Sequence, residues 1–154
     1  MIYTCGENAD YSIILKPYHG VYIFLNDGKN NFKQQYFYPI NGCYKAIAKD
    51  FDGDGDLDIA SIAFFADYVH QPEEGFVYLK NDSKLPAGKE GFTFQPYSLA
   101  AAKMGRWLTM DAGDWDGDGK IDLILGNFSI APAMIKSSVD WTKQPPFLFL
   151  KNLQ

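Results

Sequence analysis

Two short aspartate-rich segments carry the chemistry that this sequence suggests most directly. The first, residues 50–58, has aspartates at positions 1, 3, 5, 7 and 9 and glycines at positions 4 and 6. The second, residues 114–122, repeats this pattern with a lysine at position 7. Carboxylates packed this closely repel one another unless a cation or protons neutralise them. We call these segments the first and the second Asp loop.

The pattern of both Asp loops suits calcium, which takes six to eight oxygen ligands at about 2.3–2.6 Å and needs a less strict geometry than magnesium. Position 7 is Asp in one loop and Lys in the other, so we expect this residue to contribute its backbone carbonyl. The predicted ligands are Asp50, Asp52, Asp54, Asp56 and Asp58 in the first loop, and Asp114, Asp116, Asp118, Lys120 and Asp122 in the second. The sequence thus predicts two calcium sites, and the alternative is a pair of acidic turns that bind nothing.

The residues that follow each loop exclude an EF-hand. Position 12 would be a bidentate glutamate in an EF-hand, whereas here it is Ser61 or Leu125. Both residues lie in short apolar runs, 57–65 and 121–128, which are rich in β-branched and aromatic side chains. Such runs are typical of buried strands. The Asp loops are therefore expected to lead into strands.

The surroundings of the two loops repeat along the chain, with Asp58 and Asp122 separated by 64 residues. Phe-Val-Tyr-Leu-Lys-Asn at 76–81 corresponds to Phe-Leu-Phe-Leu-Lys-Asn at 147–152, and a third related strand lies at 21–26. Each unit is expected to contain four strands, with the Asp loop between the first and the second, as in a β-propeller blade. We predict an all-β partial β-propeller of about two and a half four-stranded antiparallel units.

This pattern divides the chain into three units. Residues 1–40 would form an incomplete blade, residues 41–97 the first Asp-loop blade, and residues 98–154 a second Asp-loop blade without its last strand. Because propellers usually have four to eight blades, we expect a piece of a larger propeller, or several copies that assemble into one. The exposed blade edges would allow self-association.

The sequence resembles the FG-GAP or VCBS-type repeat, the calcium-loop blade of the integrin α-subunit propeller. The resemblance rests on residues 50–61, 114–128 and 76–81. It implies calcium ligands at loop positions 1, 3, 5 and 9, and it implies a secreted protein with a role in adhesion. The element at 127–132 departs from the family pattern, because Ser129 stands where the repeat has its first glycine.

Composition and charge agree with a β-rich domain. Hydrophobic residues make up 47% of the chain and aromatic residues 16%, and no apolar run reaches the roughly 20 residues needed to cross a bilayer. The net charge is −5, but the Asp loops hold nine of the 19 acidic residues. The acidity is thus explained by the loops, and no basic patch predicts nucleic-acid binding.

The cellular location is predicted from calcium affinity and from the resemblance. Extracellular calcium modules bind at about 10⁻⁴–10⁻³ M, so weak sites would fill outside the cytosol. We expect an extracellular, periplasmic or cell-surface location, although the first residues show no signal peptide. Cys5 and Cys43 could form one bridge or remain two buried thiols.

The sequence gives little support for catalysis. The two histidines, His19 and His70, have no motif partner, and the chain contains no Gly-x-Ser-x-Gly elbow, His-Glu-x-x-His helix or phosphate-binding glycine loop. We therefore expect a non-enzymatic scaffold that binds a protein or a glycan at its loop face. The alternative is a fragment of a secreted carbohydrate-active enzyme, similar to a polysaccharide lyase, with its catalytic residues in further blades.

Candidate ligand contacts lie on the long connections 64–75 and 128–146, because repeat folds carry function on such loops. An arginine beside a tryptophan forms a further candidate pair. The candidates are Tyr68, His70, Trp141 and Lys143 on the connections, with Arg106 and Trp107 as the pair. For each of them the alternative is a packing role at the blade edges.

Overall fold

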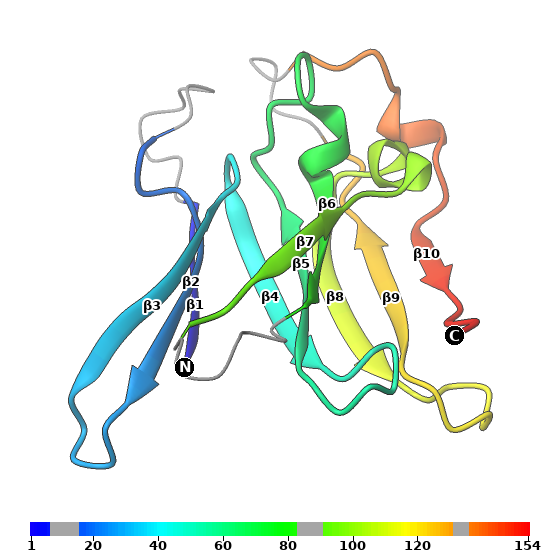
Figure 1. Cartoon of the computed structure of the whole chain (residues 1–154). Coiled ribbons are helices and arrows are strands. Elements are labelled where there is room, and N and C mark those ends of the chain that lie inside the picture. Colours follow the sequence, from blue (N-terminus) through cyan, green and yellow to red (C-terminus); the bar gives the residue numbers. More distant parts are fainter. Residues whose placement is uncertain (7–15, 83–90, 131–135) are drawn as a thin grey trace.

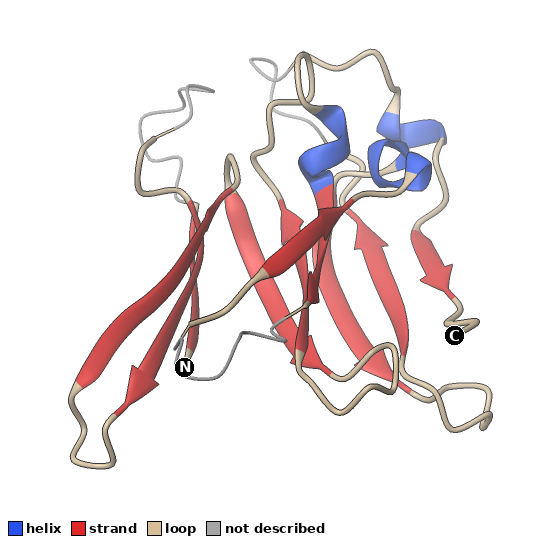
Figure 2. Cartoon of the chain, viewed as in Figure 1, coloured by secondary structure: helices blue, strands red, loops and turns tan. Residues whose placement is uncertain are grey.

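The chain folds almost entirely into β-strands. The computed structural model describes residues 1–6, 16–82, 91–130 and 136–154. Within these ranges it contains ten strands, which form three antiparallel sheets, and three short 3-10 helices, as Figures 1 and 2 show. The predicted all-β class is confirmed.

The sheets follow one another along the chain. The first sheet has the order β1 (Ile2–Cys5), β2 (Gly20–Asn26), β3 (Phe32–Pro39). The middle sheet has the order β4 (Cys43–Lys49), β5 (Asp58–Ala63), β6 (Phe76–Asn81), β7 (Phe94–Tyr97). The third sheet has the order β10 (Phe147–Leu150), β9 (Asp122–Asn127), β8 (Trp107–Gly113).

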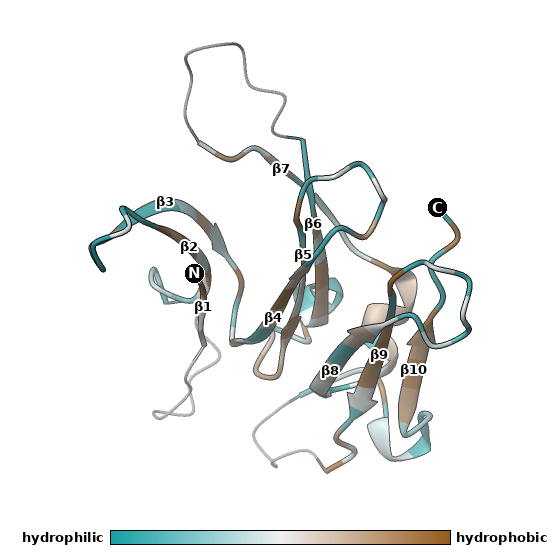
Figure 3. Cartoon of the chain, turned by 90° about the horizontal axis from the view of Figure 1, so that it is seen from below, coloured by the Kyte–Doolittle hydropathy of each residue, from teal (hydrophilic) through white to brown (hydrophobic). Residues whose placement is uncertain are grey.

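The three sheets stand side by side, with the middle sheet between the other two, as both directions of view show (Figures 1 and 3). Sheets of consecutive antiparallel strands arranged in this way are the blades of a propeller. The described chain is therefore a partial β-propeller, as the sequence predicts.

Strand β5 is the centre of this arrangement, and each of its six residues is buried. Side chains alternate between the two faces of a strand. Ile59 and Ala63 join the apolar cluster between the first and the middle sheet, whereas Ala60 and Ile62 join the cluster between the middle and the third sheet. Because both faces of β5 pack against the core, all six of its residues are buried and most of them are apolar.

The connections sort to the two ends of the sheets. The first Asp loop joins β4 to β5 and the second joins β8 to β9, and both lie at the lower end in Figure 1. The 3-10 helices η1 (Pro72–Gly75), η2 (Ala100–Met104) and η3 (Trp141–Lys143) lie at the opposite end. We call these the Asp-loop end and the helical end.

The two cysteines are both free thiols in the structure. Cys43 is buried with its Sγ 3.3 Å from the Ser61 Oγ, and burial raises the pKa of its thiol to about 12. The two thiols are therefore unbridged, but only Cys43 is buried, because Cys5 is partly exposed. Separately, none of the helices among the described residues has the length and apolar character to cross a membrane.

Candidate metal centres

Both Asp loops close strands that are paired in the same register. Lys49 at the end of β4 pairs with Asp58 at the start of β5, and Gly113 of β8 pairs with Asp122 of β9 in the same way. The same number of residues therefore spans the same gap in each sheet. Equal length and register give the two loops one common backbone path.

Glycines at positions 4 and 6 make the sharp turn of each loop possible. Gly53 and Gly55 have φ angles of 74° and 94°, and Gly117 and Gly119 have φ angles of 78° and 85°. A Cβ at any of these four positions would have no atom within 4 Å. The backbone conformation, which is costly for residues other than glycine, is therefore what requires glycine here.

The aspartate at position 1 organises each loop through the backbone. Asp50 accepts hydrogen bonds from the N–H of Gly53 at 2.8 Å and from the N–H of Gly55 at 3.0 Å, one on each carboxylate oxygen. Asp114 accepts the corresponding two bonds at 2.8 and 2.9 Å. The first aspartate therefore holds the turn and also presents its carboxylate to the inside of the loop.

Three carboxylates converge in each Asp loop. In the first loop, oxygens of Asp50, Asp52 and Asp54 all lie within 4.8 Å of one another. In the second loop the converging group is Asp114, Asp116 and Asp122. Carboxylate oxygens at these separations match the requirement of a hard divalent cation for several oxygen ligands. Each loop could therefore hold such an ion. The converging group includes the position-5 aspartate in the first loop and the position-9 aspartate in the second.

The remaining predicted ligands lie beside these groups. Asp56 and Lys120, at position 7, donate their backbone N–H groups to the position-5 carboxylates at 3.0 Å. Asp118 lies in the loop with its Oδ2 3.4 Å from the Nζ of Lys151. The use of the position-7 carbonyls as ligands stays a prediction.

A lysine from the third strand of each unit pairs with the position-3 aspartate. Lys80 of β6 pairs with Asp52, and Lys151, just after β10, pairs with Asp116. These ion pairs lower the pKa of both carboxyls and raise the pKa of both lysines. The lysine therefore balances part of the negative charge of each loop.

The aspartate at position 9 is buried in both loops. Asp58 is 1% exposed and Asp122 is fully buried. Each accepts a backbone N–H from the aromatic residue at loop position 2, at 3.3 Å in both cases. Within the described chain neither forms an ion pair with lysine or arginine. A buried carboxylate without a cationic partner is costly, so both positions favour a bound cation.

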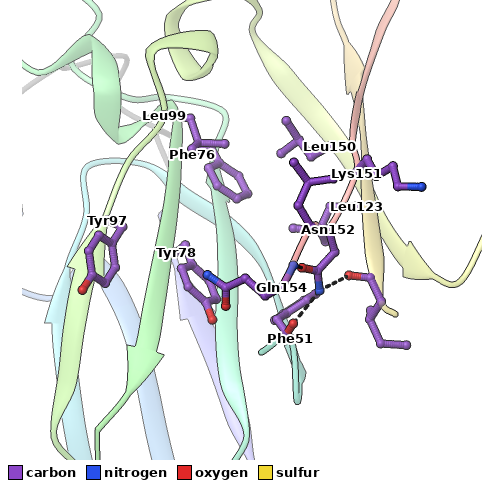
Figure 4. A pocket seen from close by; sticks show the side chains of 12 residues that line it. Phe51, Phe76, Tyr78, Tyr97, Leu99, Leu123, Leu150, Lys151, Asn152 and Gln154 are labelled. Atoms are coloured by element: carbon purple, nitrogen blue, oxygen red, sulfur yellow. Dashed lines mark hydrogen bonds between the residues drawn. The ribbon is translucent and has the colours of Figure 1, made fainter. Parts of the chain in front are cut away.

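An asparagine after each lysine connects the loop to the neighbouring strand. The N–H of Asn81 bonds to Asp58 and that of Asn152 bonds to Asp122, at 2.7 and 2.9 Å. The Asn152 side chain also donates to the carbonyl oxygens of Phe51 and Ile121. Asn152 thus ties the two Asp loops together (Figure 4).

Sequence reasoning did not assign these lysines and asparagines to the sites. Their signal is the Lys-Asn pair that ends the related segments 76–81 and 147–152. Those segments identify the repeat, but the reach of a side chain from one strand into a loop depends on the pairing of strands. The register of β5 with β6 and of β9 with β10 brings them into place.

Two of the predicted ligand contacts lie in the core. Tyr68 and Trp141 are 5% and 3% exposed, and their rings meet edge to face with centroids 4.7 Å apart. The Tyr68 hydroxyl lies within hydrogen-bond distance of the carbonyl oxygens of Ala63 and Phe64, at 3.2 and 3.0 Å. In this structure both side chains pack and leave almost no surface for a ligand.

Arg106 and Trp107 are also buried, with exposures of 1% and 2%. The Arg106 guanidinium lies 3.8 Å above the Phe64 ring and donates to the carbonyl oxygens of Phe64 and Ile130. Burial lowers the pKa of Arg106. The Trp107 indole donates to the Ala102 carbonyl at 2.7 Å. Their described contacts are therefore those of packing, the alternative that the sequence left open.

His70 and Lys143 are exposed on the helical end. Their side chains are 73% and 80% exposed, and each pairs with an aspartate three residues earlier, Asp67 or Asp140. These two candidates keep a surface that a partner can reach.

A cleft of about 320 Å³ lies between the middle and the third sheet. Figure 4 shows Phe76, Tyr78 and Leu99 on one side and Leu123 and Leu150 on the other. The lining is mostly apolar, with Lys151 and Asn152 at its edge next to the Asp loops. The cleft therefore adjoins the candidate metal centres, but no Asp or Glu side chain among the described residues lines it.

A comparison with protein families matches residues 8–61 to the FG-GAP-like repeat. The matched segment contains β2 to β4, all of the first Asp loop and the beginning of β5, and it ends before the second Asp loop. No curated protein and no solved structure matches the chain.

Proposed function

Since the chain is an FG-GAP-type repeat protein, we propose that it is a calcium-binding propeller module. Two calcium ions would occupy the two Asp loops and stabilise the fold. The module would work outside the cytosol as a scaffold for a protein or glycan partner, with a role in adhesion. It would have no catalytic activity of its own.

The observation that carries this proposal is that one loop length, one strand register and one buried position-9 aspartate recur in two sheets. Each loop gathers three carboxylates, and each has a buried aspartate at position 9 without an ion pair in the described chain. A solvated acidic turn would not need to bury a carboxylate, because burial without a cation raises the free energy of the folded state. A divalent cation removes that cost in both loops.

Calcium fits these loops better than magnesium. The loops offer carboxylates from a flexible, glycine-containing backbone, whereas magnesium requires a near-ideal octahedron and keeps most of its water. We propose side-chain ligands from positions 1, 3, 5 and 9 and the main-chain carbonyl at position 7. Asp58 and Asp118, which lie outside the converging groups, would move inward on binding.

The proposed location follows from affinity. An open, partly solvated loop that already uses a lysine for charge balance is expected to bind calcium weakly, in the range of extracellular modules. Such a site would be filled in a calcium-rich extracellular medium and nearly empty in cytosol.

The proposed partner surface is the helical end, where His70 and Lys143 are exposed. Calcium would act on it indirectly, because the Asp loops fix the strands that carry the connections. A protein or a glycan could bind there, and outer strands of the sheets such as β10 could associate with another chain.

The test is thermal unfolding of the metal-stripped protein with and without calcium. Binding to the folded state stabilises it by RT ln(1 + [Ca²⁺]/Kd), about 2.7 kcal/mol per site at a hundredfold excess over Kd. We expect a clear rise in Tm with calcium and a smaller rise in the Asp54→Ala variant. The matched control is Asp111→Ala, an exposed aspartate on β8 outside the loops.

A Tm that does not respond to calcium in the parent protein would contradict the proposal. If calcium raised the Tm of the Asp54→Ala variant as much as that of the parent, the first Asp loop would not be a calcium site.

A further inference from the structure

The strands beside the two Asp loops differ by one hydroxyl group that lies within reach of the position-9 aspartate. Strands β6 and β10, the third strands of their sheets, align residue by residue in sequence, so Tyr78 of β6 corresponds to Phe149 of β10. The aromatic contacts agree with this alignment. Tyr78 packs edge to face on Phe51 with ring centroids 5.9 Å apart, and Phe149 packs similarly on Trp115 at 6.1 Å. The two rings therefore occupy the same place in their units.

The hydroxyl of Tyr78 bonds to the position-9 aspartate of the first loop. It donates to the Asp58 Oδ2 at 2.6 Å, where the Phe51 N–H also donates at 3.3 Å. The other oxygen, Oδ1, accepts the Asn81 N–H at 2.7 Å. Asp58 thus has three donors, and both of its oxygens are in use.

Asp122 in the second loop has the two backbone bonds alone among the described contacts. Its Oδ2 accepts the Trp115 N–H at 3.3 Å and its Oδ1 accepts the Asn152 N–H at 2.9 Å. Phenylalanine at 149 has no donor for it. Asp122 belongs to the converging group of its loop, whereas Asp58 does not belong to that of the first loop. Asp58, which has the additional hydrogen bond from Tyr78, is thus also the position-9 aspartate that lies outside its converging group.

We propose that Tyr78 makes the first Asp loop the weaker of two unequal calcium sites, because its hydroxyl competes with the ion for Asp58. The inference rests on the proposed calcium function. In the second loop the buried Asp122 carboxylate is directly available as a ligand. In the first loop, calcium binding through Asp58 would require the tyrosine bond to break or lengthen.

The size of the effect follows from the bond that is given up. A hydrogen bond to a charged acceptor is stronger than one between neutral groups, and calcium would have to displace or weaken this bond while the two backbone donors stay in place. We therefore expect roughly a tenfold difference in the dissociation constant of the first loop between the parent and a variant without the hydroxyl.

The experiment measures each loop separately by isothermal titration with Ca²⁺. The first loop is isolated in a chain with Asp114→Asn and Asp116→Asn, and the second loop in a chain with Asp50→Asn and Asp52→Asn. Tyr78→Phe is introduced into the former and Phe149→Tyr into the latter. Tyr97→Phe is the matched control, since it removes a hydroxyl from the neighbouring ring, 6.3 Å away on β7.

A second measurement uses the chain with both loops intact. Trp115 lies in the second Asp loop and is the one tryptophan in either loop, so terbium luminescence excited through tryptophan reports mainly on the second site. Phe149→Tyr should weaken terbium binding there by roughly tenfold, and Tyr97→Phe should leave it unchanged. This readout does not depend on the isolated-loop variants.

The proposal expects tighter Ca²⁺ binding in Tyr78→Phe and weaker binding in Phe149→Tyr. Unchanged or weaker binding in Tyr78→Phe would overturn it and assign the tyrosine to positioning Asp58 as a ligand. An intact parent chain that binds neither Ca²⁺ nor Tb³⁺ would overturn the calcium function itself, which is a distinguishable result.

Discussion

The Asp-loop end and the helical end of this molecule are held together by different interactions. At the Asp-loop end, carboxylates converge with lysines and backbone N–H groups as their partners. At the helical end, aromatic rings pack around one buried cation, Arg106, which lies above the Phe64 ring. Calcium and salt should therefore act mainly on the Asp-loop end, whereas the helical end should respond mainly to the loss of packing.

Arg106→Ala should give the largest effect. It removes a buried side chain, leaves the carbonyl oxygens of Phe64 and Ile130 without this donor, and opens a cavity beside the aromatic rings. We expect a loss of about 3 kcal/mol in the free energy of unfolding. Urea unfolding should show the same loss in calcium and in chelator. The control is Lys103→Ala, an exposed lysine on η2.

A loss of unfolding free energy that depends on calcium would contradict this separation of the two ends, because it would show that the helical end is coupled to the Asp loops. Arg106→Lys should recover part of the stability if charge above the ring matters as well as the fork of donors.

Asp122→Asn should come next. The amide cannot accept from both Trp115 and Asn152 as the carboxylate does, so one buried N–H loses its partner. We expect a loss of about 2 kcal/mol without calcium. With calcium the deficit should grow, because the second loop loses a ligand. Chemical unfolding with and without the ion gives both values, and an equal deficit in the two conditions would argue against Asp122 as a ligand.

Lys151→Met should have a smaller effect that depends on ionic conditions. Without calcium, Lys151 balances the charge of Asp116 and Asp118, so its loss should lower the Tm in low salt. Added salt screens the repulsion between the carboxylates, and calcium neutralises it, so either should shrink the difference. A Tm difference that changes with neither salt nor calcium would mean that the alkyl chain of Lys151 stabilises the protein and its charge does not.

A change of pH should have the smallest effect on stability, and its direction should differ between the two ends. The pKa of Asp52 and that of Asp116 are lowered by their lysines, so their stabilisation is present above pH about 4 and is lost as the pH falls through the lowered pKa. At the helical end, burial raises the pKa of the half-buried Glu74. Its stabilisation is present below its ordinary pKa of 4.5 and is lost as the pH rises through the raised value.

Glu74→Gln should therefore make the protein more stable near neutral pH relative to the parent and leave the acid-side loss unchanged. Thermal unfolding between acid and neutral pH measures both slopes. If the acid-side loss disappears as well, the Asp-loop pairs are not its cause.

The sequence predicts the Asp-loop end well because its information is local. Glycine spacing sets the turns, aspartate spacing sets the carboxylates, and the apolar runs that follow give β5 and β9. The unequal surroundings of Asp58 and Asp122 could not be predicted, since they depend on which residue of β6 or β10 faces each loop.

The helical end is predicted less well because its contacts join distant parts of the chain. Arg106 reaches Phe64 across 42 residues, and Tyr68 packs on Trp141 of another unit. Polar and aromatic residues on connecting loops suggest ligand contacts from sequence alone. Their burial becomes evident only when the sheets are placed side by side.

The most direct test of the calcium assignment is isothermal titration of chelator-stripped protein with calcium. The structure predicts two binding events of unequal affinity, the stronger lost in Asp122→Asn and the weaker lost in Asp50→Asn. A folded protein that takes up no calcium would contradict the assignment and would reduce both Asp loops to acidic turns.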